Sequence, residues 1–143
     1  MIGVCIPYDS SDLYNNQWSF VLSHFKVDQI YLMGVPKNEK INLHYLKDAV
    51  HVKTAEDLPK DIPLVLLAPE SGHNIQGSES LIAFKHPADV IYLFGSDHVH
   101  FSEDNLGKRE PEFKIYIPTT TKDQMYSFVS GAITLYDGII KNG

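Results

Sequence analysis

The sequence contains a single cysteine, Cys5, which excludes an intrachain disulfide framework and a zinc site built from cysteines. Cys5 lies in the apolar run IGVCIP, so we expect a buried, inert thiol in a reducing, cytoplasmic setting. No apolar run approaches the roughly 18 residues of a membrane helix. The start of the sequence shows no basic segment followed by a long apolar one, so we expect no signal peptide and no membrane association.

Positive charge is also scarce, because Arg109 is the only arginine among 143 residues. The formal net charge of −6 argues against a large fixed nucleic-acid surface, which normally shows a basic patch. The sequence has no G-x-G-x-x-G, no P-loop and no G-x-S-x-G, so it lacks the usual signatures of dinucleotide binding, triphosphate binding and serine hydrolysis. The length fits one domain, residues 1–143, with a hydrophobic core.

Apolar runs that alternate with helical patterns predict an α/β fold, a parallel sheet with helices on both faces. The runs LVLL and VIYLF are unbroken, which is typical of strands buried on both faces. The predicted strands are Ile2–Pro7, Val27–Gly34, Ala49–Val52, Ile62–Glu70, Val90–Gly95 and Glu112–Pro118. The first predicted helix is capped by Asn15 or Asn16 and ends near Phe25. The last one, Gln124–Ile140, is capped by the preceding TTTKD. Short helical turns are predicted between them, at Leu43–Leu46, Thr54–Asp57 and Glu103–Leu106.

Ligands of parallel sheets bind at the carboxyl ends of the strands. Three predicted strands end there in small or turn-forming residues, at Ala68-Pro69, Gly95-Ser96 and Pro118-Thr119. The middle one continues into a polar, histidine-rich stretch, SDHVHFSEDNL. Asp97, His98 and His100 could hold a metal, although zinc usually needs more ligands than this stretch offers. Gly95 could instead admit a nucleotide close to the backbone, or the stretch could be a solvated turn.

The second half of the sequence resembles the SpoU/TrmH branch of the SPOUT RNA methyltransferases, in its minimal single-domain form. That family has a strand ending in Gly with a Glu soon after, a strand ending Ile-Pro, a Ser-Leu/Met-Asn helix start, and a helix ending Tyr-Glu. Here Phe94-Gly95-Ser96-Asp97, Ile117-Pro118 and Leu135-Tyr136-Asp137 match these elements. The first half, with its opening strand, asparagine-containing loop, helix and second strand, is similar to the family's opening.

The resemblance implies a SPOUT-like domain with a C-terminal trefoil knot, a homodimer, and S-adenosylmethionine as cofactor. The cofactor contacts it implies are Leu67, Gly95, Ile117, Gln124 and Met125. Asp97 is the best carboxylate for catalysis, Arg109 could supply positive charge, and Asn15 and Asn16 could line the substrate side. The sequence departs from the family's pattern, because the catalytic arginine of the first helix falls near Phe20, and the serine and asparagine of the last helix start fall on Gln124 and Tyr126. Asp97 also stands for the family's Glu, and His100-Phe101-Ser102 replaces a Gly-Leu-Ser.

Three functions follow from these observations. The first is an S-adenosylmethionine-dependent 2′-O-ribose methyltransferase of tRNA or rRNA. The second is a catalytically inactive relative, a dimeric binding or scaffold protein, which the absent arginine and the low basicity favour. The third is a flavodoxin-like nucleotide-binding protein, which explains the alternating pattern but not the Ile-Pro and Tyr-Asp elements.

Overall fold

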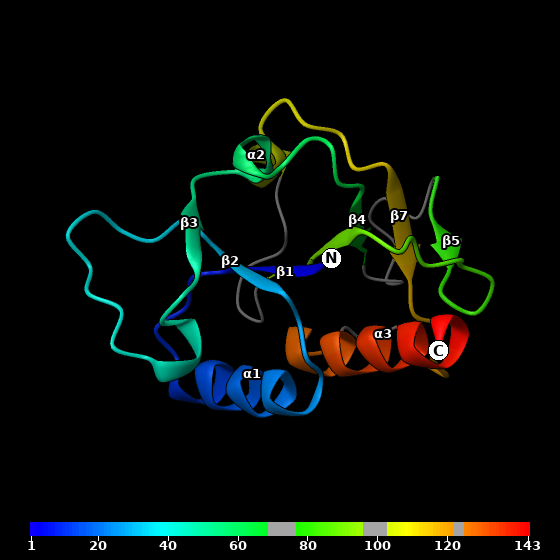
Figure 1. Cartoon of the computed structure of the whole chain (residues 1–143), viewed down its shortest axis with the longest axis horizontal. Helices are drawn as coiled ribbons and strands as arrows, with labels where there is room; N and C mark the ends of the chain where they lie inside the picture. The colour runs from blue at the N-terminus through cyan, green and yellow to red at the C-terminus, as the bar shows by residue number, and fades with distance from the viewer. Residues whose placement is uncertain (69–76, 96–102, 122–124) are drawn as a thin grey trace.

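A computed structural model describes residues 1–68, 77–95, 103–121 and 125–143, and its arrangement is drawn in Figure 1. Its strands are β1 (Ile2–Pro7), β2 (Gln29–Met33), β3 (Val50–Val52), β4 (Leu64–Leu67), β5 (Glu79–Ser80), β6 (Val90–Leu93) and β7 (Phe113–Tyr116). Its helices are α1 (Asp12–His24), α2 (Glu103–Leu106) and α3 (Ser127–Asn142), with single 3₁₀ turns η1 (His44–Leu46) and η2 (Ala55–Asp57).

The strands form one parallel sheet in the order β3-β2-β1-β6-β4-β7-β5, which confirms the predicted parallel α/β fold. The central strands β1, β4 and β6 consist almost entirely of buried side chains, as the unbroken apolar runs predict. Strand β5 has only two residues and was not predicted, because Glu79 and Ser80 carry no apolar signature.

The two faces of the sheet are covered differently. Figure 1 shows α1 and α3 side by side beneath the sheet, whereas α2 lies on the opposite side. The first face buries Trp18 of α1 and Leu135 of α3 among strand residues such as Val65 and Phe94. The second face packs Ala55, Leu58 and the partly buried Leu106 against the other side of the strands. Helices therefore lie on both faces, but the second face has only short ones among the described residues.

Two helix starts differ from the predictions. Helix α1 begins at Asp12, where the Ser11 hydroxyl accepts a hydrogen bond from the backbone N–H of Tyr14, so the cap is neither Asn15 nor Asn16. Helix α3 begins at Ser127 rather than Gln124, and its cap position is Tyr126, which makes no side-chain cap. The predicted TTTKD cap is therefore wrong.

Two further expectations concern features beyond the sheet itself. The trefoil knot stays a prediction, because the segments that follow β4, β6 and β7 include residues 69–76, 96–102 and 122–124, which lie outside the described part of the chain. Among the described residues, no helix combines the length and the apolar character that crossing a bilayer requires.

Candidate functional site

The strand order brings three predicted cofactor residues to one edge of the sheet. Strand β4 lies between β6 and β7, with Leu66 paired to Leu93 and Leu67 paired to Ile115. The pairing continues past the strands, because the backbone N–H of Ala68 donates to the carbonyl of Ile115 at 2.8 Å. In this register Leu67 ends β4, whereas Gly95 and Ile117 follow the neighbouring strands β6 and β7, within about two residues of the same level. All three residues are partly exposed. They share the carboxyl edge, where ligands of such sheets bind.

A buried tryptophan fixes the start of α3 beside this edge. Trp18 is fully buried, its ring packs edge-on against Phe94 with centroids 5.2 Å apart, and its Nε1–H donates to the Ser127 hydroxyl at 3.0 Å. Phe94 precedes Gly95, and Met125 lies two residues before Ser127. Three of the predicted cofactor residues, Leu67, Gly95 and Ile117, therefore share the carboxyl edge, and a fourth, Met125, lies on the segment that leads into α3. The fifth, Gln124, lies outside the described residues, as does the predicted catalytic Asp97.

The predicted substrate residues of α1 have different surroundings. Asn15 is buried, and its amide donates to the carbonyls of Asp9 and Ser11 at 2.8 and 3.0 Å. Its Oδ1 accepts a hydrogen bond from the Tyr45 hydroxyl at 2.8 Å. Asn15 thus holds the loop between β1 and α1 against η1, which favours a structural role over substrate contact. Asn16 is exposed and remains a predicted substrate residue.

Arg109 lies at the opposite edge of the sheet, before β7. Its Nη1 donates to the carbonyls of Leu58 and Pro59, both at 3.0 Å, and its Nη2 donates to the carbonyl of Ile62 at 2.9 Å. The residue is only 8% exposed, so it is not a solvated charge in a turn. These bonds tie the segment before β4 to the segment before β7, which favours a structural role. Catalysis by Arg109 stays a prediction that this placement does not support.

Arg109→Lys should lower the free energy of unfolding by about 1–2 kcal/mol, because one ammonium group cannot reproduce the planar fork that bonds three carbonyls. Chemical denaturation measures this loss. The exposed neighbour Lys108 provides the control, since Lys108→Ala should change stability by no more than about 0.5 kcal/mol. Unchanged stability of Arg109→Lys would contradict the structural role.

Phe20 is the residue near which the resemblance places an arginine. Phe20 lies on the outer side of α1, 64% exposed, and its ring packs against His24 with centroids 4.5 Å apart. It therefore contributes neither positive charge nor core packing. Cys5, in contrast, is fully buried in β1, which confirms the expected burial, and burial raises the pKa of its thiol.

A second polar cluster, which the sequence did not reveal, lies under the last turns of α3. His86 Nδ1 is 2.6 Å from the Tyr92 hydroxyl, and its Nε2 is 2.6 Å from Asp137 Oδ2. Lys141 pairs with the same carboxylate oxygen at 2.9 Å and also donates to the carbonyls of Ile82 and Phe84. The cluster fastens α3 to the segment between β5 and β6.

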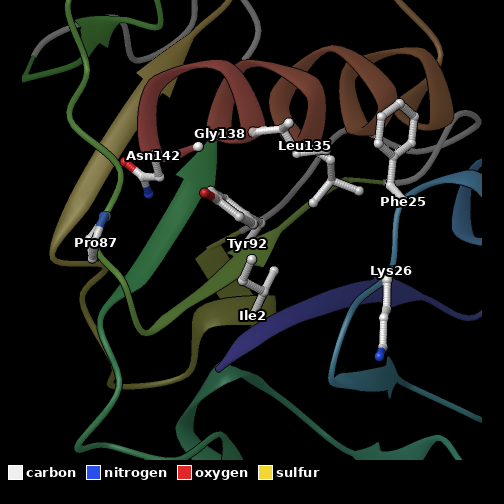
Figure 2. A pocket seen from close by; sticks show the side chains of 10 residues that line it. Ile2, Phe25, Lys26, Pro87, Tyr92, Leu135, Gly138 and Asn142 are labelled. Carbon is white, nitrogen blue, oxygen red and sulfur yellow. The ribbon is translucent and has the colours of Figure 1, made fainter.

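Beside this cluster lies a pocket of about 240 Å³, which Figure 2 shows between α3 and the start of β1. Its walls are largely apolar, and Lys26 is the one charged side chain among its lining residues. The Tyr92 hydroxyl and the Asn142 amide face this region, but both already bond to His86. The pocket therefore offers few polar groups that could orient a ligand.

The pH dependence of stability should reveal the Asp137 pairing. Burial alone would raise the pKa of Asp137, but hydrogen bonds with His86 and Lys141 outweigh it and hold the pKa below its ordinary value. A lowered pKa in the folded state stabilises the protein above the unfolded pKa, and this stabilisation is lost as the pH falls through the folded pKa. The stability difference between the wild type and Asp137→Asn should therefore be largest near neutral pH and shrink below about pH 4. A difference that stays constant from pH 7 to pH 3 in urea denaturation would contradict the pairing.

The metal hypothesis rests on Asp97, His98 and His100, which all lie outside the described residues. Within the part of the chain that the structure describes, no three histidine, cysteine or carboxylate side chains form a group that could hold an ion.

Comparison with known proteins gives a match by structure only. No family model matches the sequence, and no curated protein is similar to it. The fold is similar to that of TrmJ from Z. mobilis, with a TM-score of 0.74 and 12% identity over 96% of this chain and 68% of that one. It is also similar to the SpoU methyltransferase AviRb from Streptomyces viridochromogenes in complex with AdoMet, with a TM-score of 0.72 and 12% identity over 98% of this chain and 57% of that one.

A third structure, which explains 2-OH methylation of C/U34 on tRNA, has nearly the same length as this chain. It matches with a TM-score of 0.68 and 13% identity over 99% of this chain and 96% of that one. The chain thus spans only a little over half of some relatives and almost all of another. It has the fold of SpoU/TrmH RNA methyltransferases, at 12–13% sequence identity to these three structures.

Proposed function

We propose that the protein is an S-adenosylmethionine-dependent RNA 2′-O-methyltransferase acting on tRNA or rRNA. One observation carries the proposal, namely that the fold of a methyltransferase solved with AdoMet extends over nearly the whole chain. The residues that resemble the family's cofactor contacts support it, because Leu67, Gly95 and Ile117 share the carboxyl edge of the sheet, and Met125 lies two residues before the Ser127 hydroxyl that bonds Trp18.

The side chains at this edge suit the cofactor. Leu67 and Ile117 are partly buried against the core and offer apolar surface to an adenine ring. Gly95 has no side chain that would keep a ligand from the backbone. When bound, S-adenosylmethionine supplies an electrophilic methyl group on its sulfonium sulfur. Transfer of that methyl group to the ribose 2′-oxygen would break its bond to sulfur and release S-adenosylhomocysteine. We assign to Asp97 the acceptance of the 2′-hydroxyl proton, with Asn16 on the substrate side.

The proposal includes a knotted C-terminal region and a homodimer. Large apolar side chains are exposed on the outer side of α3, among them Ile133 at 36%, Tyr136 at 56% and Ile140 at 63%. Such a surface is unusual for a monomer. Light scattering at micromolar concentration should give the mass of a dimer, and a monomer would count against this part of the proposal.

A catalytically inactive binding protein with the same fold is the second candidate. The specific observation in its favour is that α1 contains no arginine and exposes Phe20 near the place of the family's catalytic one. Arg109 does not replace that arginine within the same chain, because its guanidinium is bonded at the opposite edge.

Transfer of tritium from labelled S-adenosylmethionine to bulk tRNA and rRNA separates the two candidates. The enzyme should label one of the pools, and digestion to nucleosides should recover the label in 2′-O-methylated products. Asp97→Asn is the matched variant, and it should abolish labelling while cofactor affinity stays within a few-fold. If the wild type binds the cofactor but transfers no label to either RNA pool, the proposed enzymatic function is wrong, and a catalytically inactive binding protein is the function that remains.

A further inference from the structure

A pair of stacked aromatic rings marks the start of α3. The rings of Tyr126 and Phe128 are almost parallel, with an interplanar angle of 13° and centroids 5.4 Å apart. Phe128 is partly buried against the core, whereas Tyr126 is 52% exposed. One face of the Tyr126 ring is therefore covered by Phe128, and the ring remains widely accessible to solvent.

This pair lies beside the candidate cofactor edge. Ser127, between the two aromatic residues, accepts the hydrogen bond from Trp18, and Trp18 packs on Phe94 next to Gly95. A substrate group whose ribose reached the end of β6 would thus have Tyr126 within its surroundings. Tyr126 also occupies the position at which the resemblance places an asparagine, so a flat ring replaces a small amide there.

We infer that Tyr126 is a stacking platform for an unpaired base of the RNA substrate, an inference that rests on the proposed function. Single-stranded RNA is recognised largely by stacking of splayed bases on aromatic side chains. Such stacking matters most where phosphate contacts are few, and this chain has 12 Lys and Arg against 18 Asp and Glu. Because Phe128 already orders the Tyr126 ring, a base loses little binding energy to fixing it.

The test measures the binding of a fluorescein-labelled single-stranded RNA of mixed sequence by anisotropy. Tyr126→Ala should weaken binding about 5- to 150-fold, which corresponds to about 1–3 kcal/mol for one stacked base. Tyr126→Phe keeps the ring and should bind within about twofold of the wild type. Val50→Ala is the control and should be without effect, because Val50 is an apolar side chain of β3 with a similar exposure of 44%, at the far end of the sheet from β4 and β7.

A series of oligonucleotides, each with one abasic position, separates base stacking from a purely structural role of Tyr126. A structural role would not make the effect of an abasic position depend on Tyr126. At one position the abasic sugar should weaken binding to the wild type but not to Tyr126→Ala, since the lost base is the one that stacks. Affinity unchanged in Tyr126→Ala, or reduced equally in Val50→Ala, would overturn the inference. A loss of S-adenosylmethionine affinity in Tyr126→Ala would overturn it too, because the ring would then serve the cofactor.

The inference and the proposed function can fail separately. If the wild type labels RNA and Tyr126→Ala binds and labels it equally well, the platform is wrong and the enzyme stands. If RNA binding depends on Tyr126 but no methyl group is transferred, the stacking role of Tyr126 is supported and the proposed methyltransferase activity is wrong. If the wild type binds no RNA, the platform is overturned whatever the cofactor does.

Discussion

Replacing Gly131 with valine should lower the free energy of unfolding by about 3 kcal/mol or more, and with alanine by about 1–3 kcal/mol. A Cβ on Gly131 would lie 2.5 Å from Cη2 and 2.8 Å from Cζ3 of Trp18, well inside contact distance. The tryptophan cannot easily move away, because it is fully buried and bonded to Ser127. The absence of a side chain at Gly131 therefore lets α3 pack directly on α1. Urea denaturation of both variants measures the loss.

The same helix offers a matched control. A Cβ on Gly138 would meet its nearest neighbours, His86 and Tyr92, at 3.6 and 3.7 Å, which is ordinary contact. Gly138→Ala should therefore be neutral or stabilise the protein by up to about 1 kcal/mol through helix propensity. In a Trp18→Phe background, Gly131→Ala should lower the free energy of unfolding by less than it does in the wild type, because the smaller ring leaves room for the added Cβ. Equal costs in both backgrounds would show that the clash with Trp18 is not the cause.

Gly95→Val should abolish S-adenosylmethionine binding while the protein stays folded. A branched side chain at the end of β6 would occupy the space that a ligand at this edge needs. With the wild type, cofactor at a hundredfold over its dissociation constant should add about 2.7 kcal/mol of stability. For a chain of this length that corresponds to a rise in Tm of roughly 10 °C, which Gly95→Val should lose entirely.

The control for this variant is its melting temperature without ligand, which should stay close to that of the wild type because Gly95 is partly exposed and lies two residues beyond the end of β6. Gly95→Ala should bind more weakly than the wild type but better than the valine variant. A full ligand-induced shift in Gly95→Val would mean that the cofactor binds elsewhere.

Local patterns explain how much of the fold could be predicted from the sequence. The parallel sheet follows from unbroken apolar runs such as Val90–Leu93, which need no knowledge of their partners. The start of α1 was missed because the segment SSDLYNN contains several residues able to cap a helix, and only the backbone geometry selects Ser11.

The candidate site was only partly predictable for a different reason. Each of Leu67, Gly95 and Ile117 ends an apolar run, but their adjacency depends on the strand order β6-β4-β7, which no local pattern encodes. The roles of Arg109 and His86 depend on partners about 50 residues away in sequence. An arginine that bonds buried carbonyls looks the same in sequence as one that contacts a substrate.

Isothermal titration calorimetry with S-adenosylmethionine and S-adenosylhomocysteine tests the central claim, that the carboxyl edge of β4, β6 and β7 is a cofactor site. The account predicts saturable binding of both ligands at one site per chain, and its loss in Gly95→Val but not in the distant variant Lys108→Ala. Absence of saturable heat from the folded wild type at millimolar concentrations of either ligand would contradict the account.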